Sequence, residues 1–268
     1  MKVTYHYRRE ELSQMWTEQT LEHLQQMRLH GMVQALLTQQ EQPDSASLSF
    51  EERLAFLVDT EWSSRENHRL TRLLKAAHLK IPQACWEEVD YSHPRGLDKS
   101  LLRSFVTGQW MTAHHHILIT GPTGVGKTYL TCALGNLACR LGHSAMYART
   151  TRLLSELSMA KGDGTYTKLL AKLAKVEVLI LDDFGQLPLT PLECHDLMEV
   201  IDDRNALHST VVASQFPIDG WHQVMADPTL AEAILDRLVH NAYKIKLTGE
   251  SMRKIQGLSP EKSNVEPE

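Results

Sequence analysis

The pattern of apolar and polar positions changes at residue 116. Before that point, apolar residues recur at helical spacing and show no strand-like alternation. One helix is predicted to begin after Ser49, because Glu52 completes a capping-box pattern and apolar residues follow at helical spacing. We therefore expect a small all-helical N-terminal domain over residues 1–90.

Beyond residue 116, short apolar runs alternate with amphipathic helical segments. Thr190 and Asp227 each precede a proline, which is the pattern of an N-cap followed by the first helical residue. Strands that alternate with helices are typical of a parallel sheet covered on both faces. We expect an α/β domain over residues 91–255 and a flexible polar tail over 256–268. Its five strands are predicted at residues 116–120, 144–148, 176–181, 210–214 and 243–247.

Composition narrows the class of protein. The chain has 268 residues, of which 42% are hydrophobic and 23% charged, as in ordinary soluble globular proteins. No apolar stretch is long enough to cross a membrane, and the first residues lack the apolar core of a signal peptide. Four scattered cysteines without a CxxC pair do not form a disulfide framework. We expect a cytoplasmic protein with no membrane partner.

The strongest motif is a glycine-rich loop between a predicted strand and a predicted helix. It matches GxxxxGK[ST] in full. Its glycines let backbone N–H groups surround phosphates, Lys127 reaches the β- and γ-phosphates, and the Thr128 hydroxyl ligates Mg²⁺. The motif therefore predicts binding of ATP with Mg²⁺. The expected nucleotide-binding residues are Gly121, Pro122, Thr123, Gly124, Val125, Gly126, Lys127, Thr128 and Tyr129.

Polar residues follow two further predicted strands. The run 178–181 ends in Asp182 and Asp183, the pattern of a Walker B strand. Asp182 is expected to hold Mg²⁺ through its water shell. Asp183 is the candidate base that polarises the attacking water, with a supporting or capping role as the alternative. Gln215 ends the next strand and is the candidate γ-phosphate sensor; Ser214 and a simple turn role are the alternatives.

Several segments together resemble the IstB-like ATP-binding proteins, the helper ATPases of two-gene bacterial insertion sequences. This family belongs to the AAA+ class of P-loop NTPases and is similar to the DnaC-like helicase loaders. The segments are residues 48–54 (LSFEERL), 121–135 (GPTGVGKTYLTCALG), 179–185 (LILDDFG), 213–217 (ASQFP), 235–242 (LDRLVHNA) and 249–253 (GESMR).

The resemblance implies an AAA+ sheet in which the sensor strand lies between the phosphate-loop strand and the Walker B strand. It also implies an arginine finger at Arg237, which would reach the ATP of a neighbouring subunit; a surface ion pair is the alternative. Arg253 is a further candidate for an ATP contact. Only residues 248–268 follow the last predicted strand, so we expect no full C-terminal lid.

The resemblance further implies ATP-dependent, sequence-nonspecific binding of duplex DNA, self-assembly on that DNA, and recruitment and stimulation of a partner transposase at a selected target site. Residues 62–80 carry five basic residues against one acidic residue, and residues 149–175 carry six against two. These stretches are either solvated helix faces or phosphate contacts. The candidate DNA contacts are Arg65, Arg69, Arg72, Lys75, Arg149, Arg152, Lys168 and Lys172.

Two other functions remain open from the sequence. A DnaC-like helicase loader shares the ATP chemistry but acts on a helicase and prefers single strands. A nucleotide-gated DNA-binding adaptor binds ATP with little hydrolysis, and the shorter Asp at position 183 leaves that possibility open. In the leading interpretation, the chain is a bacterial DNA-stimulated ATPase that acts as a transposition helper.

Overall fold

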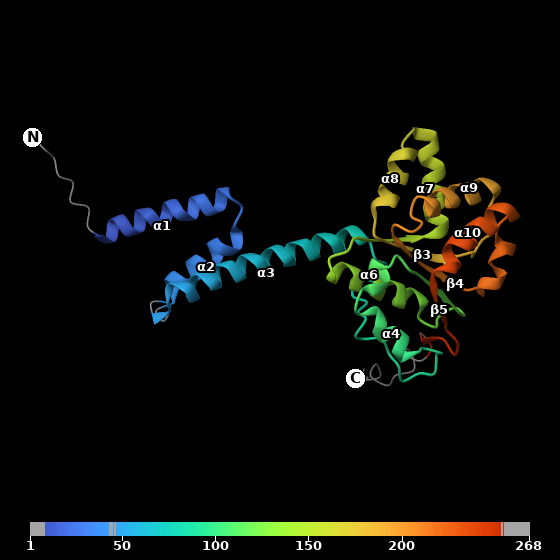
Figure 1. The fold of residues 1–268 in the computed structure, drawn as a ribbon, viewed down its shortest axis with the longest axis horizontal. Helices are drawn as coiled ribbons and strands as arrows, with labels where there is room; N and C mark the ends of the chain where they lie inside the picture. The colour runs from blue at the N-terminus through green and yellow to red at the C-terminus, as the bar shows by residue number, and fades with distance from the viewer. Residues whose placement is uncertain (1–8, 43–44, 46, 253, 255–268) are drawn as a thin grey trace, which may run out of the picture. The chain divides into compact units, whose positions relative to one another are not determined.

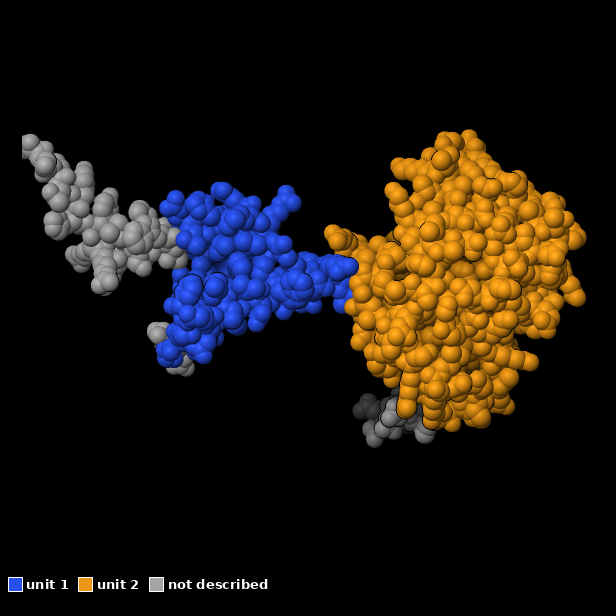
Figure 2. Space-filling model, in the orientation of Figure 1, with its two compact units in different colours: residues 1–71 blue, residues 72–268 orange. Residues whose placement is uncertain are grey.

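The computed structural model describes residues 9–42, 45, 47–252 and 254, with side chains from residue 18 onward. The chain divides into two compact units, residues 1–71 and 72–268, which Figure 2 colours blue and orange. Residues 72–90, which the sequence pattern grouped with the helical domain, belong to the second unit. The predicted tail over 256–268 lies outside the described residues.

The first unit is helical, as expected. It contains α1 (Arg9–Gln26), α2 (His30–Glu41) and most of α3 (Phe50–Ala77). The predicted capping box at the start of α3 is confirmed, because the Glu52 amide donates to the Ser49 hydroxyl at 3.2 Å and the Ser49 amide donates to the Glu52 carboxylate at 2.8 Å.

Helices α2 and α3 cross at Gly31, where the absence of a side chain lets the two backbones approach closely. A methyl group on Gly31 would meet the Glu61 Cα at 2.6 Å, so only glycine fits at this crossing. The buried Glu61 carboxylate accepts the amide hydrogen of Gly31 at 2.7 Å and that of Met32 at 3.2 Å. These amides have no partner within their own first turn, so α3 caps the N-terminus of α2. Burial raises the pKa of Glu61, but hydrogen bonds from the Arg65 side chain and from the Met32 and Gly31 amides outweigh it and hold that pKa below its usual value.

The second unit is built on a five-stranded sheet whose strands all pair in parallel, in the order β2-β3-β4-β1-β5. The predicted α/β fold and the implied position of the sensor strand β4 between β1 and β3 are confirmed. The described residues after the last strand form no multi-helix lid. The strands are β1 (His116–Thr120), β2 (Ala145–Arg149), β3 (Val178–Phe184), β4 (Ser209–Ser214) and β5 (Ala242–Lys246).

Helices cover both faces of the sheet, as Figure 1 shows, with α6 on one side and α7, α9 and α10 on the other. The predicted caps of α9 and α10 are both present: Thr190 forms a capping box, and Asp227 accepts two amide hydrogens. The helices are α4 (Lys99–Phe105), α5 (Gln109–Thr112), α6 (Lys127–Arg140), α7 (Thr150–Asp163), α8 (Tyr166–Lys175), α9 (Pro191–Asp202), the 3-10 helix η2 (Ile218–Val224) and α10 (Pro228–His240).

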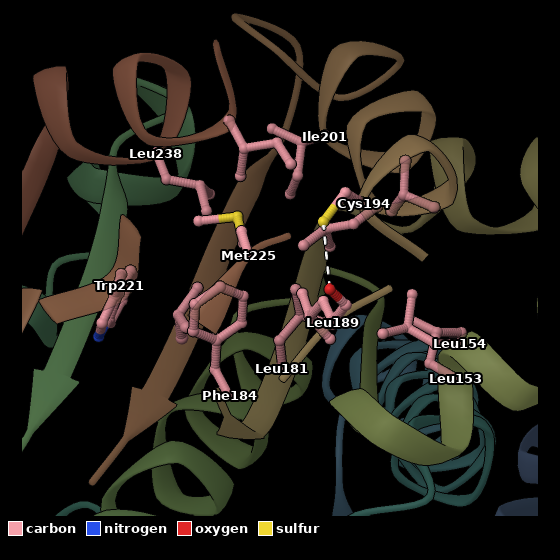
Figure 3. Close-up of a cluster of buried hydrophobic side chains, with 14 of the residues drawn as sticks. Leu153, Leu154, Leu181, Phe184, Leu189, Cys194, Ile201, Trp221, Met225 and Leu238 are labelled. Carbon is pink, nitrogen blue, oxygen red and sulfur yellow. Dashed lines mark hydrogen bonds between the residues drawn. The ribbon is translucent and has the colours of Figure 1, made fainter. Parts of the chain in front are cut away.

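The main core lies between the sheet and the α7–α10 side (Figure 3). Phe184 of β3 packs against Trp221 of η2 with ring centroids 4.6 Å apart, and leucines of α7 and α10 belong to the same buried cluster. On the opposite face, a methyl group on Gly135 would meet the Ile180 side chain at 2.8 Å, so α6 lies directly on the sheet. The helices on both faces thus hold the sheet in place, including the end of β1 at which the phosphate loop begins.

A buried guanidinium joins α8 to the sheet. Arg204 is fully buried and donates to the carbonyl oxygens of Leu173 at 2.6 Å, Val176 at 2.5 Å and Ser209 at 2.5 Å. The first two carbonyls end α8, where no backbone donor remains for them, and the third begins β4. Arg204 therefore caps a helix from inside the core. No helix among the described residues is long and apolar enough to span a membrane.

We predict that Arg204→Met lowers the free energy of unfolding of the second unit by about 3 kcal/mol, because each buried carbonyl left without a donor costs about 1–3 kcal/mol. Chemical denaturation followed by tryptophan fluorescence measures this change. The control is Lys175→Met at the exposed end of α8, which we expect to be near neutral. A loss below about 1 kcal/mol for Arg204→Met would contradict the capping role.

Candidate functional site

The glycine-rich loop joins β1 to α6 at the carboxyl edge of the sheet. Gly124 and Gly126 have φ angles of 88° and 101°, which side-chain-bearing residues rarely adopt. A methyl group on Gly126 would also meet the Arg95 guanidinium at 2.7 Å. These glycines therefore let the loop turn tightly above the first turn of α6, where backbone N–H groups point outward and favour an anion.

Lys127 lies across this loop. Its ammonium donates to the carbonyl oxygens of Gly121 at 2.6 Å and Pro122 at 2.7 Å. Burial lowers the pKa of Lys127, while Asp182 and Asp183 act in the opposite direction and favour the charged form. A phosphate bound in the loop would accept from the same ammonium and replace these carbonyls.

The Walker B carboxylate is the centre of the site. Asp182 is wholly buried, and its Oδ2 accepts from the Thr128 hydroxyl at 2.8 Å and the Tyr147 hydroxyl at 2.7 Å. The Lys80 ammonium lies 3.9 Å from the same oxygen. Burial and the hydrogen bond to Asp182 raise the pKa of Tyr147, so this tyrosine stays protonated and donates.

The second oxygen of Asp182, Oδ1, is buried and makes no hydrogen bond in the structure. A buried carboxylate oxygen without a donor is rare and implies a missing partner. Together with the neighbouring Thr128 hydroxyl, it offers the hard oxygen ligands that Mg²⁺ prefers. The residues present therefore fit the predicted magnesium ion.

Asp183 stands in a bulge of the sheet. Its φ angle is 56°, and the pairing of β3 with β4 shifts register between Leu181 and Phe184. A bulge redirects side chains, and backbone strain of this kind is concentrated at functional sites. The Asp183 carboxylate lies 3.5 Å from the Arg149 guanidinium and lines the cavity beside the loop. It is thus open to the cavity, whereas Asp182 is enclosed.

Ser214 and Gln215, the two candidates for the phosphate sensor, have different environments at the end of β4. The Ser214 hydroxyl is buried, donates to the Phe184 carbonyl at 2.8 Å and accepts the Phe216 amide hydrogen at 3.1 Å, so it is used within the fold. Gln215 is exposed and lines the cavity. The geometry therefore favours Gln215 over Ser214 for contact with a bound phosphate.

A cavity of about 630 Å³, here called the loop cavity, brings most of the predicted residues together. The hydroxyl of Tyr129 is bound to the backbone of Cys85 beside it. Met252 also lines the cavity, whereas Arg253 lies outside the described residues. The predicted site residues in the lining are Thr123, Gly124, Gly126, Lys127, Thr128, Tyr129, Asp183 and Gln215.

Three residues of the site were missed by sequence reasoning. Lys80 and Tyr147 contact Asp182, and Arg95 lines the loop cavity and donates to the Val125 carbonyl at 3.0 Å. Lys80 was noted only as part of a basic stretch, and Arg95 belongs to none of the motifs. Tyr147, on a predicted strand, carried no signal of its own. Their positions depend on how segments far apart in the sequence pack around the phosphate loop.

Arg237 is not among the described residues that line the loop cavity. Its guanidinium lies 2.8 Å from the Asp202 carboxylate and donates to the Ala233 carbonyl at 3.0 Å. Within one chain this is a surface ion pair. To act in the ATP site of a neighbouring subunit, the Arg237 guanidinium would have to leave Asp202 and bind a phosphate. The arginine finger therefore stays a prediction.

The predicted DNA contacts occupy different places. Arg149, Arg152 and Lys172 line a second hollow of about 1010 Å³, together with His78 and Lys80; we call it the basic groove. Arg149 and Lys80 line the loop cavity as well. Lys168 is exposed on α8 but is not among the described residues of the groove.

The contacts on α3 are partly paired. Arg65 forms an ion pair with Glu61 at 2.6 Å, and Arg69 lies 3.9 Å from Glu66. Glu61 stands one position outside the stretch over which the basic charge was counted, so part of that charge is neutralised. Arg72 and Lys75 are exposed near the end of the helix.

The model of the family described as IstB-like ATP binding protein matches residues 22–259. This chain belongs to that family. The match spans both units and includes the phosphate loop, the Walker B strand and Gln215. It confirms the resemblance drawn from the sequence, and ATP binding is the property by which the IstB-like family is described.

Curated relatives of this IstB-like chain are named as insertion sequence ATP-binding proteins. One, y4pL of Sinorhizobium fredii, is 45% identical over 90% of this chain and 98% of its own length. Another, from insertion sequence IS1162 of Pseudomonas fluorescens, is 51% identical over 76% of this chain and 88% of its own length.

Solved structures share the fold. The DnaC helicase loader covers 61% of this IstB-like chain and 96% of its own, with a TM-score of 0.54 and 21% identity. AMPPCP-bound DnaA from Aquifex aeolicus covers 70% of this chain and 58% of its own, with a TM-score of 0.55 and 18% identity. At these identities the similarity shows the AAA+ fold alone.

We predict that Mg²⁺ tightens ATP binding in the wild-type chain and has little effect in Asp182→Asn, because the neutral amide is a weaker ligand than the carboxylate. Titration of a fluorescent ATP analogue with Mg²⁺ and with EDTA measures this difference. Glu88→Gln, which removes another acid from the loop cavity, is the matched control and should keep the Mg²⁺ effect. Equal Mg²⁺ dependence in Asp182→Asn would contradict the proposed site.

Proposed function

We propose that this chain is an ATP-hydrolysing, duplex-DNA-binding protein that self-assembles on DNA and acts as a transposition helper. One observation carries the proposal: Lys80 and Arg149 line both the loop cavity and the basic groove, so the proposed nucleotide site and the proposed DNA surface share two cations. The names of the relatives, insertion sequence ATP-binding proteins, supply the biological setting.

Hydrolysis of ATP follows from the proposed roles around the loop cavity. The loop amides and Lys127 bind the phosphates, and Asp183 accepts a proton from the water whose oxygen attacks the γ-phosphorus. The bond to the β–γ bridging oxygen breaks, which yields ADP and phosphate. Gln215 contacts the γ-phosphate, and Arg237 of a neighbouring copy stabilises the charge that develops.

Magnesium would be held by Thr128 and Asp182, and when bound it neutralises phosphate charge. Tyr147 and Lys80 contact the Asp182 carboxylate and keep it oriented for this role. Arg149 pairs with Asp183 from the neighbouring strand, which places a groove residue in direct contact with the proposed catalytic base.

DNA binding is proposed for the basic groove. Arginine and lysine side chains that contact phosphates give affinity without sequence choice and make binding depend strongly on salt. Arg152 and Lys172 line the groove without lining the loop cavity, so they are the residues through which DNA contact is separable from nucleotide contact. Lys168, Arg65, Arg69, Arg72 and Lys75 are proposed as additional contacts outside the groove.

As a helper, the protein would assemble on a DNA segment in its ATP-bound state and recruit and stimulate a partner transposase there. The position of the assembly would then contribute to the choice of target site. In this proposal hydrolysis limits the lifetime of the assembly, because loss of the γ-phosphate removes the contacts of Gln215 and Arg237.

We predict that duplex DNA of plasmid length increases ATP turnover by the full chain, and that Lys127→Ala and Asp183→Asn both abolish the increase. Release of phosphate, measured with and without DNA, tests this. Asp183→Asn should still bind ATP, whereas Lys127→Ala should bind it weakly, because Lys127 is the one of these two residues that contacts the phosphates of bound ATP.

Two other outcomes would each indicate a different function for this chain. Tight ATP-dependent DNA binding with negligible turnover would contradict the ATPase assignment and indicate a nucleotide-gated adaptor. A preference for single strands would indicate a helicase loader, the function named for the DnaC structure that shares this fold.

We predict that Arg152→Glu together with Lys172→Glu weakens DNA binding and lowers its salt dependence by about two phosphate contacts, while ATP affinity stays unchanged. Fluorescence anisotropy of labelled duplex at several salt concentrations measures both effects. Reversal of exposed Lys175 on α8, outside the groove lining, is the control. Unchanged DNA affinity at moderate salt would remove the groove from the proposal.

A further inference from the structure

Two arginines are buried among the described residues, and their surroundings differ. Arg204 donates from Nε, Nη1 and Nη2 to acceptors inside the core, and it is not among the described residues that line the loop cavity or the basic groove. Arg95 is 6% exposed and lines the loop cavity. Its Nε is enclosed by protein and makes no hydrogen bond. A buried donor without an acceptor is rare, so Arg95 differs from a guanidinium that only stabilises the fold.

The position of Arg95 is set by three segments of the second unit. Its Nη1 donates to the Val125 carbonyl of the phosphate loop at 3.0 Å, and its Nη2 donates to the Asp90 carbonyl. The Arg95 carbonyl accepts the amide hydrogen of Thr248, which follows β5, at 3.0 Å. The guanidinium is so close to the loop that a methyl group on Gly126 would meet Nη1 at 2.7 Å. The charge is therefore held against the phosphate loop.

The positive charge of Arg95 has no acidic partner in the part of the chain that the structure describes. The ion pairs of the second unit involve other cations. The nearby Asp90 carboxylate accepts from the Ser92 hydroxyl at 2.6 Å and the Ser92 amide at 2.7 Å, and it lies 2.6 Å from the His93 ring. A buried charge without an opposite charge is costly. An anion that enters the loop cavity would remove this cost.

We propose that Arg95 is a second cation of the nucleotide site and donates to a phosphate of ATP bound in the same chain. The phosphates are the anionic part of ATP, and a guanidinium binds phosphate through charge-assisted hydrogen bonds. Lys127 reaches the phosphates from the start of α6, and Arg95 reaches them from the segment before α4. Arg237 differs from both, because its proposed role lies in a neighbouring copy. This inference rests on the ATP-binding part of the proposed function and adds a residue to it.

Isothermal titration calorimetry of the full chain with ATP and Mg²⁺ tests this role. Arg95→Gln keeps a donor for the Val125 carbonyl but loses the charge, so we expect the ATP dissociation constant to rise about ten- to hundredfold. Arg95→Lys keeps the charge without the planar fork and should recover part of this loss. Arg103→Gln on the exposed face of α4 is the control and should bind ATP like the wild type.

Two results of this titration would overturn the proposal. One is an unchanged ATP affinity in Arg95→Gln, since the guanidinium would then serve the fold alone. The other is an Arg95→Lys variant that binds ATP no better than Arg95→Gln. We also expect the ATP affinity of Arg95→Gln to depend less on salt than that of the wild type, because one charge that salt screens is gone. Circular dichroism confirms that each variant keeps its helical content.

Inorganic tripolyphosphate separates a phosphate contact from a contact to the sugar or base. A ligand that binds the folded state raises the melting temperature, so tripolyphosphate should stabilise the wild type and Arg103→Gln but not Arg95→Gln. Equal stabilisation of Arg95→Gln, together with weaker ATP binding, would overturn the phosphate contact and indicate the sugar or base instead.

A measurement on the wild type does not depend on how Arg95→Gln folds. In a nuclear magnetic resonance spectrum of chain labelled at arginine, the Nε–H signal of Arg95 is the one absent from Arg95→Lys. Tripolyphosphate should shift this signal, and an unchanged signal at saturation would overturn the proposal. Absent ATP turnover with Arg95-dependent ATP binding would refute the proposed hydrolysis alone. Full DNA-stimulated turnover with unchanged ATP affinity in Arg95→Gln would refute this inference alone.

Discussion

The buried carboxylate of Asp182 is the interaction on which the site depends. A charge without solvent is costly unless hydrogen bonds and opposite charges surround it. Thr128 supplies one donor from the phosphate loop, Tyr147 supplies another from β2, and Lys80 brings a positive charge from the segment before α4. The contacts of the carboxylate thus come from different parts of the fold, and its remaining oxygen has no hydrogen-bond partner among the described residues.

The order of the strands extends this constraint to the rest of the site. With β4 between β1 and β3, the residue that follows β4 opens into the same cavity as the loop and the Walker B strand. The bulge at Asp183 then turns one carboxylate outward while its neighbour stays enclosed. Two adjacent acids therefore have different environments, and so they suit different roles.

Much of this arrangement could be predicted from the sequence. Local signals sufficed for the caps of α3, α9 and α10, and the phosphate-loop motif carries its own geometry; the strand order came from the resemblance. Lys80, Arg95 and Tyr147 could not be found, because their places depend on tertiary packing around the loop. Arg149 shows the same limit: its charge suggested DNA, and the fold places it against Asp183 as well. The scarcity of buried apolar side chains within residues 18–42, 45 and 47–71 was hidden too, since helical spacing alone does not tell which apolar face is covered.

We propose that the loop cavity binds ATP with magnesium through Lys127, Thr128 and Asp182. A crystal structure of the chain with Mg²⁺ and a non-hydrolysable ATP analogue tests it most directly. We expect the Lys127 ammonium to leave the carbonyls of Gly121 and Pro122 for the phosphates, and Asp182 Oδ1 to gain a contact to the hydrated ion. A bound analogue that leaves the Lys127 contacts unchanged, with no ion near Asp182, would contradict this mode of binding.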